Sequence, residues 1–347
     1  MIFTRHASGP ILTRDDIPDV PPALVDATSV FNPGAARVGE RDVLFLRVQT
    51  RGRRTHLMVA ECVSDAAWVF GGETAAWRAF VAHRELVELV GFERMGETIH
   101  HVYDPRVTHI EGVWYVVLAV DVDSTCRLAV ARTDDFRRLE LIGAVGEGRA
   151  DGPGVNGTAG AWDDVRNGVL FPERIDGRYA MLLRPNRVSS GEAAGSGYRI
   201  VLATSDDLVG WRDDGHVMSG RWHHWDELIG PGPPPLKTRE GWLLVYHGVA
   251  THLATAWIYQ AGVVLLNLDD PTIVIARGRD NVLEPRERWE MTGQVPNVVF
   301  PTGLVCETDA DGFADSDAEV RLYYGAADTC VGFATTTVGR LLAACRI

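Results

Sequence analysis

The chain has 347 residues, of which 46% are hydrophobic and 23% are charged, and this composition is typical of a globular protein. Its 34 basic and 47 acidic residues give a formal charge of −13, which argues against nucleic acid as a partner. No apolar run approaches the roughly 20 residues of a membrane-spanning helix, so we expect no membrane partner.

The N-terminal stretch "MIFTRHASGPILTRDDIPDVPP" lacks a basic region followed by an apolar one, so no signal peptide is expected. The five cysteines are odd in number and form no CxxC pair, which argues against a disulfide framework. Both features favour a reducing, cytoplasmic location.

Strand signals dominate the chain. Short apolar runs, each bounded by Gly, Asp, Asn or Pro, predict strands separated by turns; they are "VLFLRV", "VWYVVLAV", "YAMLLRP", "GWLLVYHG", "AGVVLLNL" and "VRLYYGAA". Residues 73–91 have some helical character and predict a surface helix or an extended loop.

Five segments repeat one pattern, in which a proline precedes an apolar strand, a turn and a second strand. The marker prolines are Pro33, Pro105, Pro172, Pro235 and Pro301, spaced by 72, 67, 63 and 66 residues. A regular period in an all-β sequence predicts a propeller or a solenoid, and about 65 residues suit one four-stranded blade. The alternative is a large β-sandwich with coincidental prolines.

In a propeller, the ends of the innermost strands converge on a shared funnel. Proline suits the first residue of a strand because it has no N–H to donate. We therefore expect Asn32, Asp104 and Lys237, which lie within two residues of marker prolines, to face one another.

Residues able to bind sugar and phosphate gather near these strand ends. They are Asn32, Arg47, Asp104, Arg106, Arg166, Asn167, Arg184, Lys237, Tyr246, His247 and Asp328. Carboxylates and amides bind sugar hydroxyls, whereas arginine and lysine bind phosphate. One acid with several cations favours phosphorolysis, because phosphate is itself a nucleophile. Taken singly, each residue has a structural alternative: a turn aspartate, a surface arginine or a core histidine.

Other motifs predict little. The pairs His100–His101 and His223–His224 lack the spacing of a metal site, and no P-loop, dinucleotide fingerprint or nucleophile elbow is present. We therefore predict no metal and no cofactor, with inorganic phosphate as a co-substrate. Trp222 and Trp225 are compatible with a sugar-stacking lip, but also with ordinary packing.

The chain resembles glycoside hydrolase family 130, which contains inverting β-mannoside phosphorylases and some β-1,2-mannosidases. The resemblance spans about residues 28 to 340 and rests on seven strings: "FNPGA", "YDPRVT", "RNGVLFPERIDGRY", "LLRP", "IGPGPPPLKTREGWLLVYHGV", "VPNVVFPTG" and "YYGAADT". It implies a five-bladed β-propeller, here a single catalytic domain over residues 1–347 whose short terminal segments close the ring. It also implies a homo-oligomer.

The resemblance also implies roles for individual residues. Asp104 matches the proton donor, which acts through a hydroxyl of the mannosyl ring. Four residues match mannosyl-binding positions: Asn32, Arg47, Asn167 and Asp328. Four others match phosphate-side positions: Arg166, Lys237, His247 and Tyr259.

Two features depart from the family pattern. Gln260 stands where the family often has arginine, and the glycine-rich segment 146–165 is longer than usual and lies where it could reshape the acceptor side.

The resulting hypothesis is an inverting phosphorylase that cleaves a β-1,4- or β-1,2-linked manno-oligosaccharide, or a mannosyl-glucose, to α-mannose 1-phosphate. A first alternative is an inverting β-mannosidase, in which Glu173 or Glu227 would activate water. A second is a non-catalytic carbohydrate-binding propeller.

Overall fold

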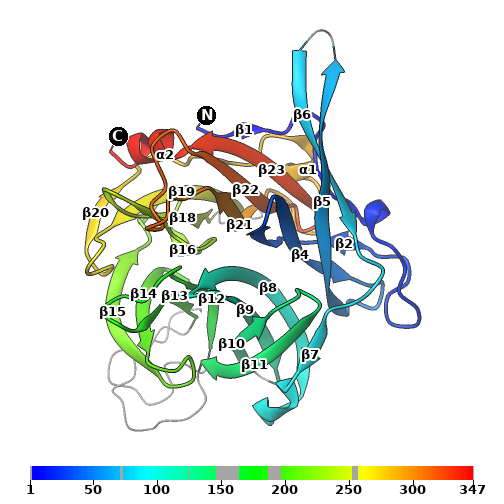
Figure 1. Ribbon diagram of the computed structural model, residues 1–347, viewed down its shortest axis with the longest axis horizontal. Coiled ribbons are helices and arrows are strands. Elements are labelled where there is room, and N and C mark those ends of the chain that lie inside the picture. Colours follow the sequence, from blue (N-terminus) through cyan, green and yellow to red (C-terminus); the bar gives the residue numbers. More distant parts are fainter. Residues whose placement is uncertain are drawn as a thin grey trace.

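The computed structural model describes residues 2–70, 73–123, 125–145, 164–186, 197–251 and 257–346, with the backbone alone for 64–70 and 73–78. The predicted segment 146–165 lies almost entirely outside this part of the chain. The strands form five sheets, antiparallel apart from one edge strand, that are arranged around a central axis (Figure 1). The predicted five-bladed β-propeller is thus confirmed.

Each blade begins with an inner strand near the axis. Blade 1 consists of β2 (Ser29–Val30), β3 (Gly34–Val38), β4 (Arg41–Gln49), β5 (Thr55–Phe70) and β6 (Glu73–Ala82). Blade 2 consists of β8 (Ile99–Ile110), β9 (Val113–Val122), β10 (Thr125–Thr133), β11 (Arg138–Val145) and the parallel edge strand β7 (Glu88–Val90). Blade 3 consists of β12 (Val165–Leu170), β13 (Tyr179–Pro185), β14 (Arg199–Ser205) and β15 (Trp211–Ser219).

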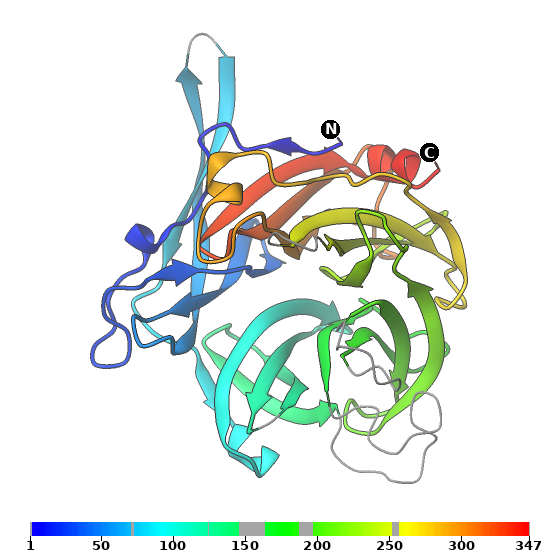
Figure 2. The same cartoon turned by 180° about the vertical axis from the view of Figure 1, so that it is seen from behind.

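The last two blades follow the same order. Blade 4 consists of β16 (Leu228–Pro231), β17 (Leu236–Thr238), β18 (Gly241–Ala250), β19 (Ile258–Leu266) and β20 (Val274–Arg277). Blade 5 consists of β21 (Val299–Cys306), β22 (Glu319–Ala326), β23 (Cys330–Thr337) and the N-terminal strand β1 (Thr4–Arg5). Both ends of the chain therefore lie beside blade 5, as Figure 2 shows from behind.

The core is divided among the five gaps between neighbouring blades. On β4, Val43 and Phe45 pack with Val116 and Leu118 of blade 2. The alternate residues of β4, such as Leu44, pack toward blade 5. Successive side chains of a strand point to opposite faces, so a strand buried on both faces is apolar throughout. This explains the continuous apolar runs of the sequence.

Helical segments are short. They are η1 (Arg14–Asp16), η2 (Phe92–Met95), α1 (Arg288–Met291) and α2 (Val338–Ala344). No helix in the described part of the chain is long and apolar enough to cross a membrane.

The expected helix or loop over residues 73–91 was wrong where the structure has strands, at β6 and at β7. Glu73–Ala82 forms β6, which pairs with β5 in a hairpin that extends beyond the ring (Figure 1). The pairing with β5 overrides the helical propensity of the alanine-rich sequence.

Candidate active site

All five inner strands are interrupted near the middle of the ring. Residues 31–33 separate β2 from β3, and residues 232–235 separate β16 from β17. Bulges interrupt β8 between Tyr103 and Arg106, β12 between Arg166 and Val169, and β21 between Pro301 and Gly303. Bulges redirect side chains out of the regular alternation, so polar residues can face the axis here.

Asp104 lies at the bulge of β8. Its backbone has a positive φ of 54°, and its side chain is almost fully buried. Nη1 of Arg47 donates to Oδ1 of Asp104 at 3.3 Å. The guanidinium of Arg47 also lies over the rings of Phe31 and Tyr103, at 4.2 and 4.6 Å. The carboxyl group is therefore held from blade 1 as well as from its own strand.

Arg106 fixes the backbone at Asp104. Its guanidinium is fully buried and donates to three carbonyl oxygens, those of Asp104 (3.1 Å), Gly232 (2.9 Å) and Pro231 (3.3 Å). These bonds link blade 2 to blade 4 across the axis. Burial lowers the pKa of Arg106 to about 10, so the group still carries its charge at neutral pH.

Two further arginines lie side by side on blade 3. Arg166 and Arg184 are paired residues of β12 and β13. Arg184 donates to Oδ1 of Asn186 at 3.1 and 3.3 Å, and Nη2 of Arg166 lies 3.8 Å from Oδ1 of Asp121. Burial and then the neighbouring charge of Arg166 lower the pKa of Arg184. Adjacent cations with so few acidic partners are suited to binding an anion such as phosphate.

Asp328 closes the site from blade 5. It follows β22 with a positive φ of 51°. Burial raises its pKa to about 6, with a smaller raising effect from Asp104 that Arg47 opposes. Tyr259 of β19 lies within reach of the charges of Arg184 and Asp328, and burial raises its pKa. Two carboxyl groups thus share the charge of Arg47.

Several buried polar atoms at the site have no hydrogen-bond partner within the described residues. They are Nδ2 of Asn32, Oδ1 of Asn167 and both ring nitrogens of His247. Burial lowers the pKa of His247 well below its ordinary value, with Arg184 and Arg106 adding to the shift, so its ring is neutral. Unpartnered buried donors and acceptors are costly unless a ligand or water completes them, and sugar hydroxyls can do both.

Of the nine residues to which the family resemblance gives a role, Lys237 is the one that the structure does not bring to this cluster. Its Nζ donates to Oε2 of Glu173 at 2.7 Å and lies over the ring of Phe313. Both charged residues line a separate cavity of about 410 Å³, with Arg37 and Glu111 from other blades. Lys237 follows the interruption of blade 4 instead of preceding it, so it lies toward the turn end of the strands.

The other eight predicted residues come together from all five blades, with His247 and Tyr259 representing blade 4. Sequence reasoning missed Tyr103, Asp121 and Phe300, and it left Arg184 among the candidates. The ring of Phe300 lies 4.6 Å from that of His247. Aligning the five interruptions would have found Tyr103, because it precedes the bulge of β8 as Arg166 precedes that of β12.

Gln260, which replaces a common arginine, is buried and faces the segment that joins β20 to β21. Its Oε1 accepts a hydrogen bond from Nδ2 of Asn281 at 2.7 Å.

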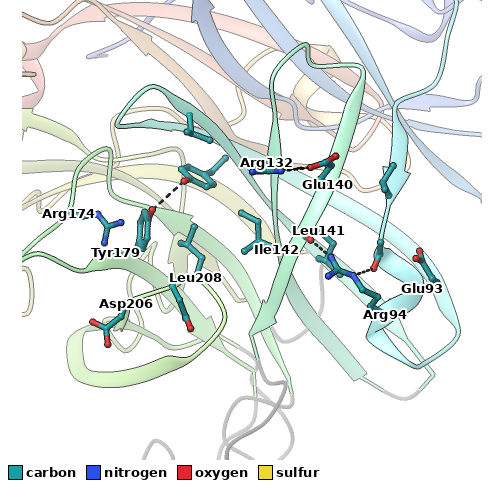
Figure 3. Close-up of a pocket in the computed structure, with 15 residues that line it drawn as sticks. Glu93, Arg94, Arg132, Glu140, Leu141, Ile142, Arg174, Tyr179, Asp206 and Leu208 are labelled. Atoms are coloured by element: carbon teal, nitrogen blue, oxygen red, sulfur yellow. Dashed lines mark hydrogen bonds and ion pairs between the residues drawn. The ribbon is translucent and has the colours of Figure 1, made fainter.

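A larger cavity, of about 700 Å³, lies between blades 2 and 3 (Figure 3). It shares no residue with the cluster around Asp104. Arg132 in this cavity pairs with Glu140 at 2.8 Å, and Arg174 pairs with Glu111 at 3.2 Å. Because these two arginines already have carboxylate partners, and Arg94 of the same cavity donates to two backbone carbonyl oxygens, the cavity is the poorer candidate for a phosphate-using site.

The fold and the site together define a propeller that can hold a sugar, a proton-donating carboxyl group and an anion at one end of its axis. The comparisons with known proteins agree. The family model described as beta-1,4-mannooligosaccharide phosphorylase matches residues 18–347, and the chain belongs to this family, glycoside hydrolase family 130.

Two named relatives indicate the class of enzyme within this family. The chain is 29% identical to a beta-1,4-mannooligosaccharide phosphorylase of Ruminococcus albus, over 97% of this chain and 89% of that protein. It is 40% identical to a beta-1,2-mannobiose phosphorylase of Thermoanaerobacter sp., over 67% of this chain and 66% of that protein. Family and relatives indicate a glycoside phosphorylase.

The fold has a close counterpart among solved structures. The beta-1,2-mannobiose phosphorylase from Listeria innocua, solved as a complex with beta-1,2-mannobiose, superposes with a TM-score of 0.75 at 21% identity. The match covers 99% of each chain.

Proposed function

We propose that this protein is an inverting phosphorylase of β-linked mannosides, acting on β-1,4- or β-1,2-linked manno-oligosaccharides or on a mannosyl-glucose. The observation that carries the proposal is the position of Asp104, a buried carboxyl group held by Arg47, close to the paired cations Arg166 and Arg184. An acid beside an anion site is what phosphorolysis of a glycosidic bond requires.

In the proposed reaction, an oxygen of orthophosphate attacks the anomeric carbon from the α face while the bond to the leaving oxygen breaks. Asp104 supplies the proton that the leaving oxygen takes up, relayed through a hydroxyl of the mannosyl ring. The products are α-mannose 1-phosphate and the shortened acceptor. Arg166 and Arg184, with Tyr259, hold the phosphate; Asn32, Asn167 and Asp328 bind the mannosyl unit.

The first prediction concerns Asp104. Proton donation by a positioned acid contributes about 10²–10⁴ in rate, so Asp104→Asn is expected to lower turnover by that factor while leaving the melting temperature close to that of the wild type. The loss of turnover is measured as the rate of phosphate-dependent formation of mannose 1-phosphate from β-1,4- and β-1,2-mannobiose. Near-normal activity of the folded variant would remove Asp104 from the acid role.

A hydrolase of the same family is the second candidate, and the position of Lys237 favours keeping it, because one cation expected on the phosphate side lies elsewhere. Of the two carboxylates considered as a base, Glu173 is paired with Lys237. Glu227 lies at the same end of blade 4 as His247, where it accepts a hydrogen bond from Thr251. Free mannose released at an equal rate without phosphate, and abolished by Glu227→Gln, would establish hydrolysis.

The acceptor is identified most directly in the synthetic direction. Incubating α-mannose 1-phosphate with glucose, mannose, N-acetylglucosamine or mannobiose, and measuring released phosphate, ranks the acceptors. Release with none of them, together with no phosphorolysis or hydrolysis of either mannobiose, would leave a carbohydrate-binding propeller as the better description.

A further inference from the structure

Tyr103 lies between the part of the site that holds Asp104 and Arg47 and the part that holds Arg166. Tyr103 directly precedes Asp104 in the chain, and its ring is buried. The guanidinium carbons of Arg47 and Arg166 both lie over this ring, at 4.6 and 5.9 Å from its centroid. The hydroxyl of Tyr103 donates a short hydrogen bond of 2.6 Å to Oδ1 of Asp121. Asp121 lies on β9, paired with His101 of β8.

Asp121 is a natural competitor of phosphate. It is the acidic partner of Arg166 among the described residues, but the two groups stay 3.8 Å apart. Both side chains keep a third or more of their surface exposed, 33% for Asp121 and 40% for Arg166. A free carboxylate next to an arginine prefers a closer, bidentate pair that occupies two of its donors. Something must therefore restrain the Asp121 carboxylate from approaching Arg166 more closely.

The hydroxyl of Tyr103 supplies that restraint. Burial raises the pKa of Tyr103 far above its ordinary value, so the hydroxyl keeps its proton at any working pH. The thiol of Cys126, 3.5 Å from the same hydroxyl, is also neutral because burial raises its pKa to about 11. Asp121 is thus the charged group to which the Tyr103 hydroxyl donates.

We propose that Tyr103 is a positioning residue that holds the Asp121 carboxylate back from Arg166 and so keeps the donors of Arg166 open for phosphate. This inference rests on the proposed phosphorylase function. Without the hydroxyl, Asp121 closes onto Arg166 and phosphate has to displace it. The sugar side of the site, which is held by Arg47 and Asp104, is unaffected.

The test uses two substitutions singly and together. Tyr103→Phe keeps the ring and removes the hydroxyl; we expect the KM for phosphate to rise about tenfold, which is the effect of losing about 1.4 kcal/mol. The KM for the mannoside and kcat at saturating phosphate should stay within about twofold of the wild type. Adding Asp121→Asn to Tyr103→Phe removes the competing charge and should bring the KM for phosphate back to within about twofold of the wild type.

The matched control is Asp123→Asn in the Tyr103→Phe background. Asp123 directly follows β9, the strand that carries Asp121, but it pairs with His100. Removing its charge should therefore leave the KM for phosphate as high as in Tyr103→Phe alone. A merely structural role of Tyr103 predicts that the double variant is no better than Tyr103→Phe, and that result would overturn the inference. So would an unchanged KM for phosphate in Tyr103→Phe.

Calorimetric titration with inorganic phosphate separates this inference from the proposed function. A wild type without phosphate-dependent turnover would count against the proposed function. Equal dissociation constants for phosphate in the wild type and in Tyr103→Phe would count against the role of Tyr103.

Discussion

Asp328 illustrates how a site residue can weaken the fold that carries it. Burial raises its pKa to about 6, against 3.8 for an ordinary aspartate. Between these two values the folded protein binds more protons than the unfolded chain, so this group makes stability fall as the pH rises through that interval. Above pH 6 the full effect applies, and a shift of roughly two units corresponds to about 3 kcal/mol.

Asp328→Asn should therefore stabilise the protein at about pH 7.5, by as much as about 3 kcal/mol, and give a much smaller gain near pH 4, where the carboxyl group is protonated in the folded protein and about half ionised in the unfolded chain. Activity should fall because the charged acceptor for the sugar is lost. Urea unfolding at the two pH values measures the first effect. Asp317→Asn, an exposed change on the same blade, should show no such pH dependence; an equal gain at both pH values for Asp328→Asn would contradict the assignment.

At the scale of elements, the interruptions of the inner strands bring neighbouring blades into close contact. Gly34 begins β3, and a Cβ at this position would lie 2.9 Å from the carbonyl oxygen of Pro105 and 2.9 Å from Cγ2 of Val107. Pro105 follows Asp104 directly. The contact between β3 and β8 therefore leaves no space for a side chain at the point where the acid is positioned.

Gly34→Ala should lower the free energy of unfolding by about 1–3 kcal/mol, as overpacking does. It should also lower kcat, because the clash displaces the backbone beside Asp104. Thermal unfolding and turnover are compared with Gly52→Ala, whose added Cβ meets only Thr50 Oγ1 at 3.8 Å. Wild-type stability and turnover in Gly34→Ala would show that the two strands adapt without moving the acid.

At the scale of the whole molecule, the sequence predicted the ring well because each blade repeats the same order of interruption, turn and strand. The marker prolines placed two members of the candidate site, because Asn32 and Asp104 lie directly before them, whereas the roles of the other members rest on the family resemblance. The sequence misplaced Lys237 because this residue lies in β17, beyond the interruption that ends at Pro235, whereas Asp104 lies within the interruption of blade 2. The register of a strand decides which end a residue faces, and a proline alone does not fix the register.

Other features depend on contacts that no local pattern contains. The bond between Tyr103 and Asp121 requires the pairing of β8 with β9. Two of the three carbonyl partners of Arg106 come from blade 4, more than a hundred positions along the chain. Such residues become visible only when the blades are assembled.

Closure of the ring depends on the N-terminal strand. β1 pairs with β23, and the guanidinium of Arg5 forms a buried pair with Glu290, with Nε to Oε1 at 2.7 Å. The hydroxyl of Tyr324 also donates to Glu290, at 2.8 Å. Glu290 is fully buried, so removing Arg5 leaves a charge that water cannot reach.

Arg5→Ala should therefore lower the free energy of unfolding by about 3 kcal/mol, the lower end of the range for a broken buried ion pair, since other donors remain. Arg14→Ala is the matched control, because its pair with Asp15 is exposed and should contribute less than about 0.5 kcal/mol. Replacing both partners, Arg5→Met with Glu290→Gln, should recover part of the loss. If urea unfolding gives the same value for Arg5→Ala and Arg14→Ala, the N-terminal strand does not hold the last blade in place.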